Sequence, residues 1–246
     1  MLALRAVVFD LDDTLYPERD FVLSGFRAVA LWAEERLGIP ADRGWTELRR
    51  LFEAGFRGDV FNRWLEGHGF RPDPLVPQMV QVYRGHHPHI APYPEVPGVL
   101  RRLRGRYRLG LISDGYVEVQ KRKLAALGLA SCFDDLIFSD DWGREAWKPD
   151  PRPFAALLER WGLAGDQAVY VADNPLKDFL GARRVGMRTV RVRRADGLYR
   201  HLEPPSPDHA PDLEMENLEG LEAVLQEWAE RGGDEDPDVF ARHHRG

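Results

Sequence analysis

Short apolar runs that end in polar residues recur along the chain and predict the strands of a buried sheet. The first run, residues 4–9, contains Val7 and Val8 and stops abruptly at Asp10. Four more runs share this character, at residues 107–112, 135–138, 167–172 and 187–192. Helical patterns lie between them, for example at residues 117–127 and 153–161, each followed by a glycine. Alternating strands and helices predict a parallel sheet covered on both faces.

A long stretch from about Tyr16 to Tyr93 breaks this alternation, because it contains helical patterns but no convincing strand. Pro17 and the proline-rich residues 88–94 mark its ends. The helical patterns lie at residues 21–37, 45–54, 60–68 and 75–83. We therefore expect an α/β protein: a Rossmann-like parallel sheet core of residues 1–15 and 95–230 with an inserted all-helical cap domain of residues 16–94. Beyond the last strand we expect a surface loop at residues 195–211, a closing helix at 218–228 and a mobile tail at 231–246.

The charge balance narrows the classes of partner. The 246 residues include 34 Lys and Arg against 40 Asp and Glu, and the net charge of −6 argues against binding a nucleic-acid polymer. No apolar run approaches the roughly 20 residues of a membrane span, and no secretory signal is visible. We therefore expect a cytoplasmic protein with no membrane partner and leave its oligomeric state open. The single cysteine, Cys132, excludes an intrachain disulfide and is expected to be buried.

Candidate chemistry begins where the first predicted strand ends. Residues 10–14 read Asp-Leu-Asp-Asp-Thr, and alternate residues of an extended segment point the same way, so Asp10 and Asp12 can face one ligand. Ligands of open parallel sheets bind beyond the carboxyl ends of the strands. The ends of the other predicted strands therefore bear directly on the same site.

Each of these other ends is polar. The second strand leads into Ser113 and Asp114 near a helix start, which suits an anion although it is also an ordinary turn. After the third strand Lys148, one of only four lysines, stands in a stretch stiffened by prolines. The fourth strand leads into Asp173 and Asp178, which could also be a helix cap and a surface charge. Clustered carboxylates are costly unless a cation lies among them, and Mg²⁺ prefers oxygen ligands.

This ordered set of motifs resembles the haloacid dehalogenase-like superfamily of phosphohydrolases, in particular members with a helical cap inserted between the first and second motifs. The resemblance covers roughly residues 7–225. It implies that Asp10 is the nucleophile that accepts the phosphoryl group and that Asp12 is the general acid and base. Ser113 and Lys148 would hold the phosphoryl group, and Asp114 is expected to belong to the same phosphate-binding set. Asp12 would need a raised pKa when ligand is bound, while Asp10 stays ionised.

The same resemblance implies a Mg²⁺ cofactor. Asp10, the backbone carbonyl of Asp12, and Asp173 would be its ligands, and Asp178 would support them. The chain departs from the common pattern at Asp114, where Asn is frequent, and at Ala172, where Gly is frequent. Neither change removes a reactive group. Asp114 adds negative charge near the phosphate site and so bears on substrate preference.

The expected function is Mg²⁺-dependent hydrolysis of a small phosphorylated metabolite, such as a nucleotide, a sugar phosphate or a phosphorylated acid, through an aspartyl-phosphate. A phosphomutase of the same fold and a catalytically silent phosphate-ligand-binding protein stay open as alternatives. Asp12 disfavours a dehalogenase, because a halide leaves without a proton. A response-regulator receiver would place its lysine last, whereas Lys148 precedes Asp173. In the cap, Arg19 and Arg27 are candidates for a second anionic group of the substrate.

Overall fold

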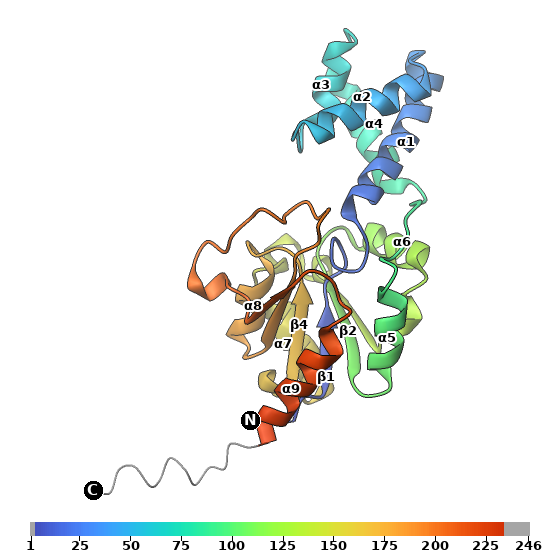
Figure 1. Cartoon of the computed structure of the whole chain (residues 1–246). Helices are drawn as coiled ribbons and strands as arrows, with labels where there is room; N and C mark the ends of the chain where they lie inside the picture. The colour runs from blue at the N-terminus through green and yellow to red at the C-terminus, as the bar shows by residue number, and fades with distance from the viewer. Residues whose placement is uncertain (1–2, 234–246) are drawn as a thin grey trace, which may run out of the picture. The chain divides into compact units, whose positions relative to one another are not determined.

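The computed structural model describes residues 3–233 and contains a parallel sheet of six strands (Figure 1). The strand order is β3-β2-β1-β4-β5-β6, so the first strand of the chain lies in the middle. Every pair of neighbours is parallel. The strands are β1 (Ala6–Phe9), β2 (Arg108–Ser113), β3 (Asp135–Phe138), β4 (Ala168–Ala172), β5 (Arg188–Val192) and β6 (Leu213–Met215). The predicted Rossmann-like α/β core is therefore confirmed.

The described residues divide into two compact units. Residues up to Pro17 and from Ala91 onward form the α/β unit, and Glu18–Ile90 form a helical unit between β1 and α5 in the chain. The helical unit consists of α1 (Glu18–Leu37), α2 (Ala41–Glu53), α3 (Val60–Gly67) and α4 (Pro72–Gly85). The α/β unit carries α5 (Val96–Arg104), α6 (Val117–Leu127), α7 (Arg152–Trp161), α8 (Asp178–Arg184) and α9 (Leu221–Gly233).

Apolar side chains of the central strands form the core of the α/β unit. Alternate residues of β1 and β4 face α7 and α8, and they pack against Phe154, Leu157 and Phe179. The strands read as continuous apolar runs because a parallel sheet buries both of its faces. The backbone of α8 at Gly181 lies close to the backbone at Pro149, and this close packing helps to position α8. A Cβ on Gly181 would lie only 2.7 Å from the carbonyl oxygen of Pro149. This contact joins α8 to the loop that carries Lys148.

The helical unit has its own aromatic core. The ring of Phe26 in α1 contacts the rings of Phe52, Phe61 and Tyr83 from three other helices. Glu47 joins α2 to α3, because it accepts hydrogen bonds from Trp64 Nε1 at 2.8 Å and pairs with His68. The unit therefore has packing of its own. None of the described helices is long and apolar enough to cross a bilayer.

Several sequence-based expectations need correction. Strand β6 lies just beyond the expected surface loop and went unpredicted, because three half-exposed residues give no apolar run. Helix α5 was also missed, although its buried Val96, Val99, Leu100 and Leu103 follow helical spacing. Cys132 is partly exposed rather than buried. The closing helix continues to Gly233, and the rest of the expected tail lies outside the described residues.

Candidate active site

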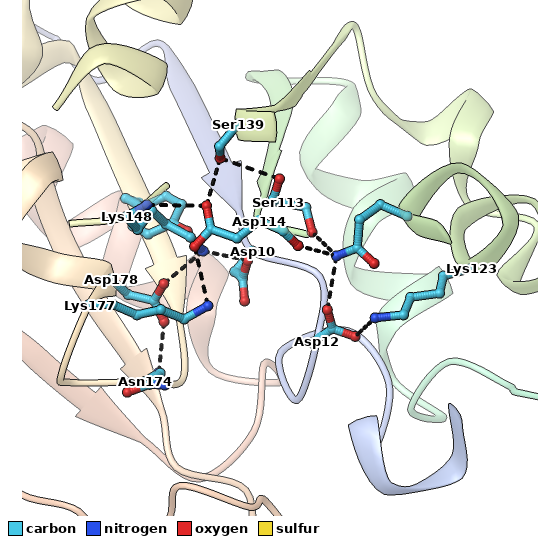
Figure 2. Close-up of polar contacts among 12 residues, drawn as sticks. Asp10, Asp12, Ser113, Asp114, Lys123, Ser139, Lys148, Asn174, Lys177 and Asp178 are labelled. Atoms are coloured by element: carbon cyan, nitrogen blue, oxygen red, sulfur yellow. Dashed lines mark hydrogen bonds and ion pairs between the residues drawn. The ribbon is translucent and has the colours of Figure 1, made fainter. Parts of the chain in front are cut away.

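The strand order brings the polar strand ends to one edge of the sheet. Because β1 lies between β2 and β4, Asp10 stands between Ser113, the last residue of β2, and Asp173, which follows β4. The chain moves outward through β2 and β3 and then returns to the other side of β1 at β4. Such a reversal point is where open α/β sheets bind ligands. Figure 2 shows side chains from these ends turned toward one another.

Lys148 occupies the centre of the site and is fully shielded from solvent. Its Nζ lies 2.6 Å from Asp10 Oδ1 and 2.7 Å from Asp178 Oδ1, and it donates to the hydroxyl of Tyr170 at 2.9 Å. Burial alone would lower the pKa of Lys148, but the two carboxylates raise it well above its ordinary value. Lys148 is therefore a permanent cation beside the carboxylate of Asp10.

Three buried carboxylates, those of Asp10, Asp173 and Asp178, offer oxygen atoms within 4.8 Å of one another. Burial raises the pKa of Asp10 to about 6 despite Lys148, with Asp178 and Asp12 adding to the rise. Burial and the neighbouring carboxylates also raise the pKa of Asp173 well above its ordinary value. Like charges at this separation resist joint ionisation unless a cation lies among them.

The donor set suits a small divalent cation. Asp178 Oδ1 is buried and receives no well-aligned hydrogen bond, although Lys148 Nζ lies close by. The other oxygen, Asp178 Oδ2, accepts a hydrogen bond from the backbone amide of Asn174 at 2.8 Å. Carboxylate oxygens are the ligands that Mg²⁺ prefers. Asp178, expected only to support the site, thus reaches the carboxylate cluster itself. Within the described residues no histidine or cysteine joins such a cluster.

The carboxylate of Asp12 has a different environment from that of Asp10. Lys123 donates to its Oδ1 at 2.7 Å, Gln120 donates to its Oδ2 at 3.1 Å, and the hydroxyl of Tyr16 also donates to Oδ1. Burial would raise the pKa of Asp12, but Lys123 and these hydrogen bonds lower it. The expected order of the two pKa values is thus reversed without ligand. A divalent cation beside Asp10 would lower its pKa again.

Gln120 and Lys123 were missed by sequence reasoning. Both are buried, on α6, and lie three residues apart, which places them on one face of the helix. The sequence did hold a signal, because Lys123 is one of four lysines and precedes the apolar Leu124 within the predicted helix. Their shared partner, Asp12, lies in the loop that follows β1, more than 100 residues earlier in the chain, and no local pattern indicates such a contact.

The expected phosphate-binding residues also come together. Ser113 Oγ accepts a hydrogen bond from Gln120 Nε2 at 2.6 Å, so the serine hydroxyl keeps its own proton available for a ligand. The carboxylate of Asp114 accepts from Ser139 Oγ at 2.6 Å and from the amide of Lys148 at 3.2 Å. Burial opposes its ionisation, but Lys148, Lys177 and these donors lower the pKa of Asp114.

The cap candidates have partners inside the helical unit. Arg19 pairs with Glu53, and Arg27 pairs with Asp42 at 2.6 Å. Arg27 also lines a hollow of about 950 Å³ together with His86, His87 and His89. Both arginines are thus already neutralised by carboxylates of their own unit, and nothing in their contacts singles them out for a substrate.

Comparisons with known proteins identify the family. The profile of the haloacid dehalogenase-like hydrolases matches residues 4–186. A glyceraldehyde 3-phosphate phosphatase of Methanopyrus kandleri is 34% identical over 235 residues, which cover 92% of this chain and 99% of that protein. A phosphoserine phosphatase of Thermus thermophilus is 34% identical over 191 residues, or 77% of this chain and 70% of that protein.

A solved structure agrees with these relatives. The 2-haloacid dehalogenase from Pseudomonas syringae superposes with a TM-score of 0.63 at 28% identity, covering 92% of this chain and 99% of that one. The chain therefore belongs to the haloacid dehalogenase-like hydrolase family, as its four motifs indicated. The family match ends at residue 186, and the M. kandleri relative carries the similarity over almost the whole chain.

Proposed function

We propose that this chain is a Mg²⁺-dependent phosphatase, a phosphoric monoester hydrolase that acts on small phosphorylated metabolites through an aspartyl-phosphate. The observation that carries the proposal is the different surroundings of two neighbouring carboxylates. Asp10 lies against Lys148 and in the carboxylate cluster, whereas Asp12 lies against Lys123 and Gln120. A phosphatase of this kind needs one carboxylate as nucleophile and another for proton transfer.

Asp10 is the nucleophile of this proposal. One of its oxygens attacks phosphorus, the bond to the leaving oxygen breaks, and Asp12 donates a proton to that oxygen. A water molecule then attacks the phosphorus of the aspartyl-phosphate, Asp12 takes up its proton, and inorganic phosphate leaves with Asp10 restored. Lys148 and Ser113 hold the phosphoryl oxygens, where fixed charges and donors lower the barrier more than covalent assistance does.

Asp10, Asp173 and Asp178 are the residues that would hold Mg²⁺, with the backbone carbonyl of Asp12 as a further ligand. The cation would supply positive charge for the phosphoryl oxygens and would keep Asp10 ionised. Lys148 stays beside Asp10 in either state, because it is buried between two carboxylates.

The names of the relatives support a small substrate. Glyceraldehyde 3-phosphate and phosphoserine, the substrates in those names, are both small phosphoesters. In the chain, the helical unit is inserted between β1 and α5, where the family resemblance implies a cap domain. We expect the protein to work in the cytoplasm, where such metabolites occur.

Dehalogenase activity is the alternative suggested by the solved structure from P. syringae. Asp12, which Lys123, Gln120 and Tyr16 hold in place, argues against it, because a halide leaves without a proton and needs no second carboxylate beside the nucleophile. A phosphomutase would keep all the same groups but would return the phosphoryl group to a sugar. Turnover of glucose 1-phosphate to its 6-phosphate isomer separates the mutase from the phosphatase.

A phosphate-release screen tests the proposal. The wild type and Asp10→Asn are assayed with and without Mg²⁺ on p-nitrophenyl phosphate, glyceraldehyde 3-phosphate, phosphoserine, sugar phosphates and nucleoside monophosphates. We expect Mg²⁺-dependent release by the wild type and none by Asp10→Asn. A folded, Mg²⁺-loaded wild type that releases phosphate from no member of the panel would refute the proposal.

A further inference from the structure

The candidate phosphate site contains a carboxylate, and a carboxylate opposes the binding of an anion. Asp114 directly follows Ser113, and its side chain is only 6% exposed. Its Oδ1 accepts hydrogen bonds from Ser139 Oγ and from the amide of Lys148. A negative charge at this place repels a phosphoryl group unless a cation compensates it.

Lys177 is the cation that compensates it. It comes directly before Asp178, at the start of α8, and its Nζ lies 3.3 Å from Asp114 Oδ2 (Figure 2). Asp10 and Asp178 also interact electrostatically with its ammonium group, and Lys148 repels it. The ammonium group of Lys177 therefore lies close enough to Asp10 and Lys148 to interact with both.

The three lysines near the carboxyl ends of the strands differ in the solvent exposure of their side chains. The side chain of Lys148 is 0% exposed and that of Lys123 is 7% exposed, whereas that of Lys177 is 35% exposed. Lys148 is committed to Asp10 and Asp178, and Lys123 is committed to Asp12 through a 2.7 Å contact. The contact between Lys177 and Asp114 is the longest of these ion pairs, and one flexible side chain can exchange it for another acceptor.

The sum of the charges at the carboxyl ends of the strands also supports a role for Lys177. The carboxylates of Asp10, Asp12, Asp114, Asp173 and Asp178 face three lysines, and even one divalent cation would leave no excess of positive charge among these groups. A phosphoryl group then adds negative charge that Lys148, already shared by two carboxylates, offsets only in part. An ammonium group that can turn from Asp114 to the ligand supplies the missing positive charge.

We propose that Lys177 is a second phosphoryl-binding lysine, held by Asp114 in the empty site and transferred to the phosphoryl oxygens when ligand enters. This assignment rests on the proposed phosphatase function. Asp114 then sets the affinity, because the ligand must compete with its carboxylate for Lys177. The pair also explains why an acidic residue is tolerated directly after Ser113.

The test is a double-mutant cycle of Asp114→Asn and Lys177→Met, read by calorimetric binding of inorganic phosphate in Mg²⁺. Asparagine keeps the acceptor for Ser139 and the Lys148 amide, and methionine keeps the length of the lysine stem. Lys121→Met is the matched control, because Lys121 is an exposed lysine on α6 that pairs with Glu118. Phosphate binding requires no turnover, so it can be measured whether or not the phosphatase assay succeeds.

We expect Asp114→Asn to tighten phosphate binding and Lys177→Met to weaken it about tenfold, the usual size for one charge-assisted hydrogen bond. Lys177→Met should weaken binding by a larger factor in the Asp114→Asn background, where no carboxylate competes for the ammonium group, while Lys121→Met leaves binding unchanged. If Lys177 served only to pair with Asp114, its loss would weaken phosphate binding only where it leaves the Asp114 carboxylate unpaired, and so not in the Asp114→Asn background. Unchanged phosphate affinity on adding Lys177→Met to Asp114→Asn would therefore overturn the proposal.

Absence of phosphatase activity would test the proposed function and not the role of Lys177. If the wild type binds phosphate but releases none from any phosphoester, the phosphatase proposal fails, while the cycle still decides the role of Lys177. If turnover occurs, KM for p-nitrophenyl phosphate should follow the same pattern as phosphate affinity across the four proteins of the cycle. If Lys177→Met leaves KM unchanged both in the wild type and in Asp114→Asn, the assignment is contradicted.

Discussion

At the scale of single residues, Lys148 is the side chain whose removal should disturb the site most. It is the cation between the buried carboxylates of Asp10 and Asp178, and breaking such a buried pair costs about 3–5 kcal/mol. We expect Lys148→Met to lose activity and to lower the free energy of unfolding by roughly that amount in Mg²⁺-free buffer. Urea denaturation measures this, and added Mg²⁺ should restore part of the loss. Unchanged stability without Mg²⁺ would contradict the assignment.

Lys123 acts through another residue. Because it holds the carboxylate of Asp12 at 2.7 Å, its loss should misplace the general acid while leaving the phosphate-binding groups intact. We expect Lys123→Met to lower kcat about tenfold or more with little change in KM, since a charge-assisted hydrogen bond is lost. Lys123→Arg should recover part of kcat, and Lys121→Met should behave as wild type. A change confined to KM would instead place Lys123 in substrate binding.

At the scale of elements, α8 and the Lys148 loop depend on Gly181. A Cβ there would lie 2.7 Å from the carbonyl oxygen of Pro149 and 2.9 Å from that of Asp150. We expect Gly181→Ala to destabilise the fold by about 1–3 kcal/mol and to lower activity by shifting Lys148. Gly67→Ala in α3 meets no atom within 4 Å and should stabilise by about 0.4–1 kcal/mol. Thermal unfolding compares the two variants, and equal effects would refute this close-packing argument.

The elements also show what a sequence can and cannot predict. Strands β1 to β5 were recognisable because both faces of a parallel sheet are buried and leave continuous apolar runs. Strand β6 has only three residues, and it exists because β5 offers it an edge to pair with. The set of strand-end residues followed from the fold class alone, since parallel strands deliver their carboxyl ends to one edge. The contacts of Gln120 and Lys123 with Asp12 join residues more than 100 positions apart, so no local pattern could predict them, whereas Tyr16 lies only four residues from Asp12.

At the scale of the whole molecule, the carboxylate cluster couples stability to Mg²⁺ and pH. Burial raises the pKa of Asp10 from 3.8 to about 6, so the folded chain keeps a proton that the unfolded chain releases in this range. The contribution of Asp10 to the unfolding free energy of the Mg²⁺-free protein should therefore fall as pH rises from about 4 to about 6. Mg²⁺ replaces the proton, so its stabilising effect should grow over the same range.

Thermal unfolding with and without Mg²⁺, at about pH 5 and about pH 7.5, checks this coupling. The rise in Tm caused by Mg²⁺ should be larger at the higher pH, and Asp173→Asn should reduce it. A rise that is equal at the two pH values would mean that the buried carboxylates do not hold the cation.

The central claim is that Asp10 takes up the phosphoryl group, and trapping this covalent intermediate tests it most directly. Wild type and Asp10→Asn are mixed with the preferred phosphoester and Mg²⁺, quenched in acid within one turnover, digested and analysed by mass spectrometry. We expect a phosphorylated peptide that contains Asp10 in the wild type, with no such peptide and no turnover in Asp10→Asn. Phosphate release by Asp10→Asn at the wild-type rate would contradict the mechanism.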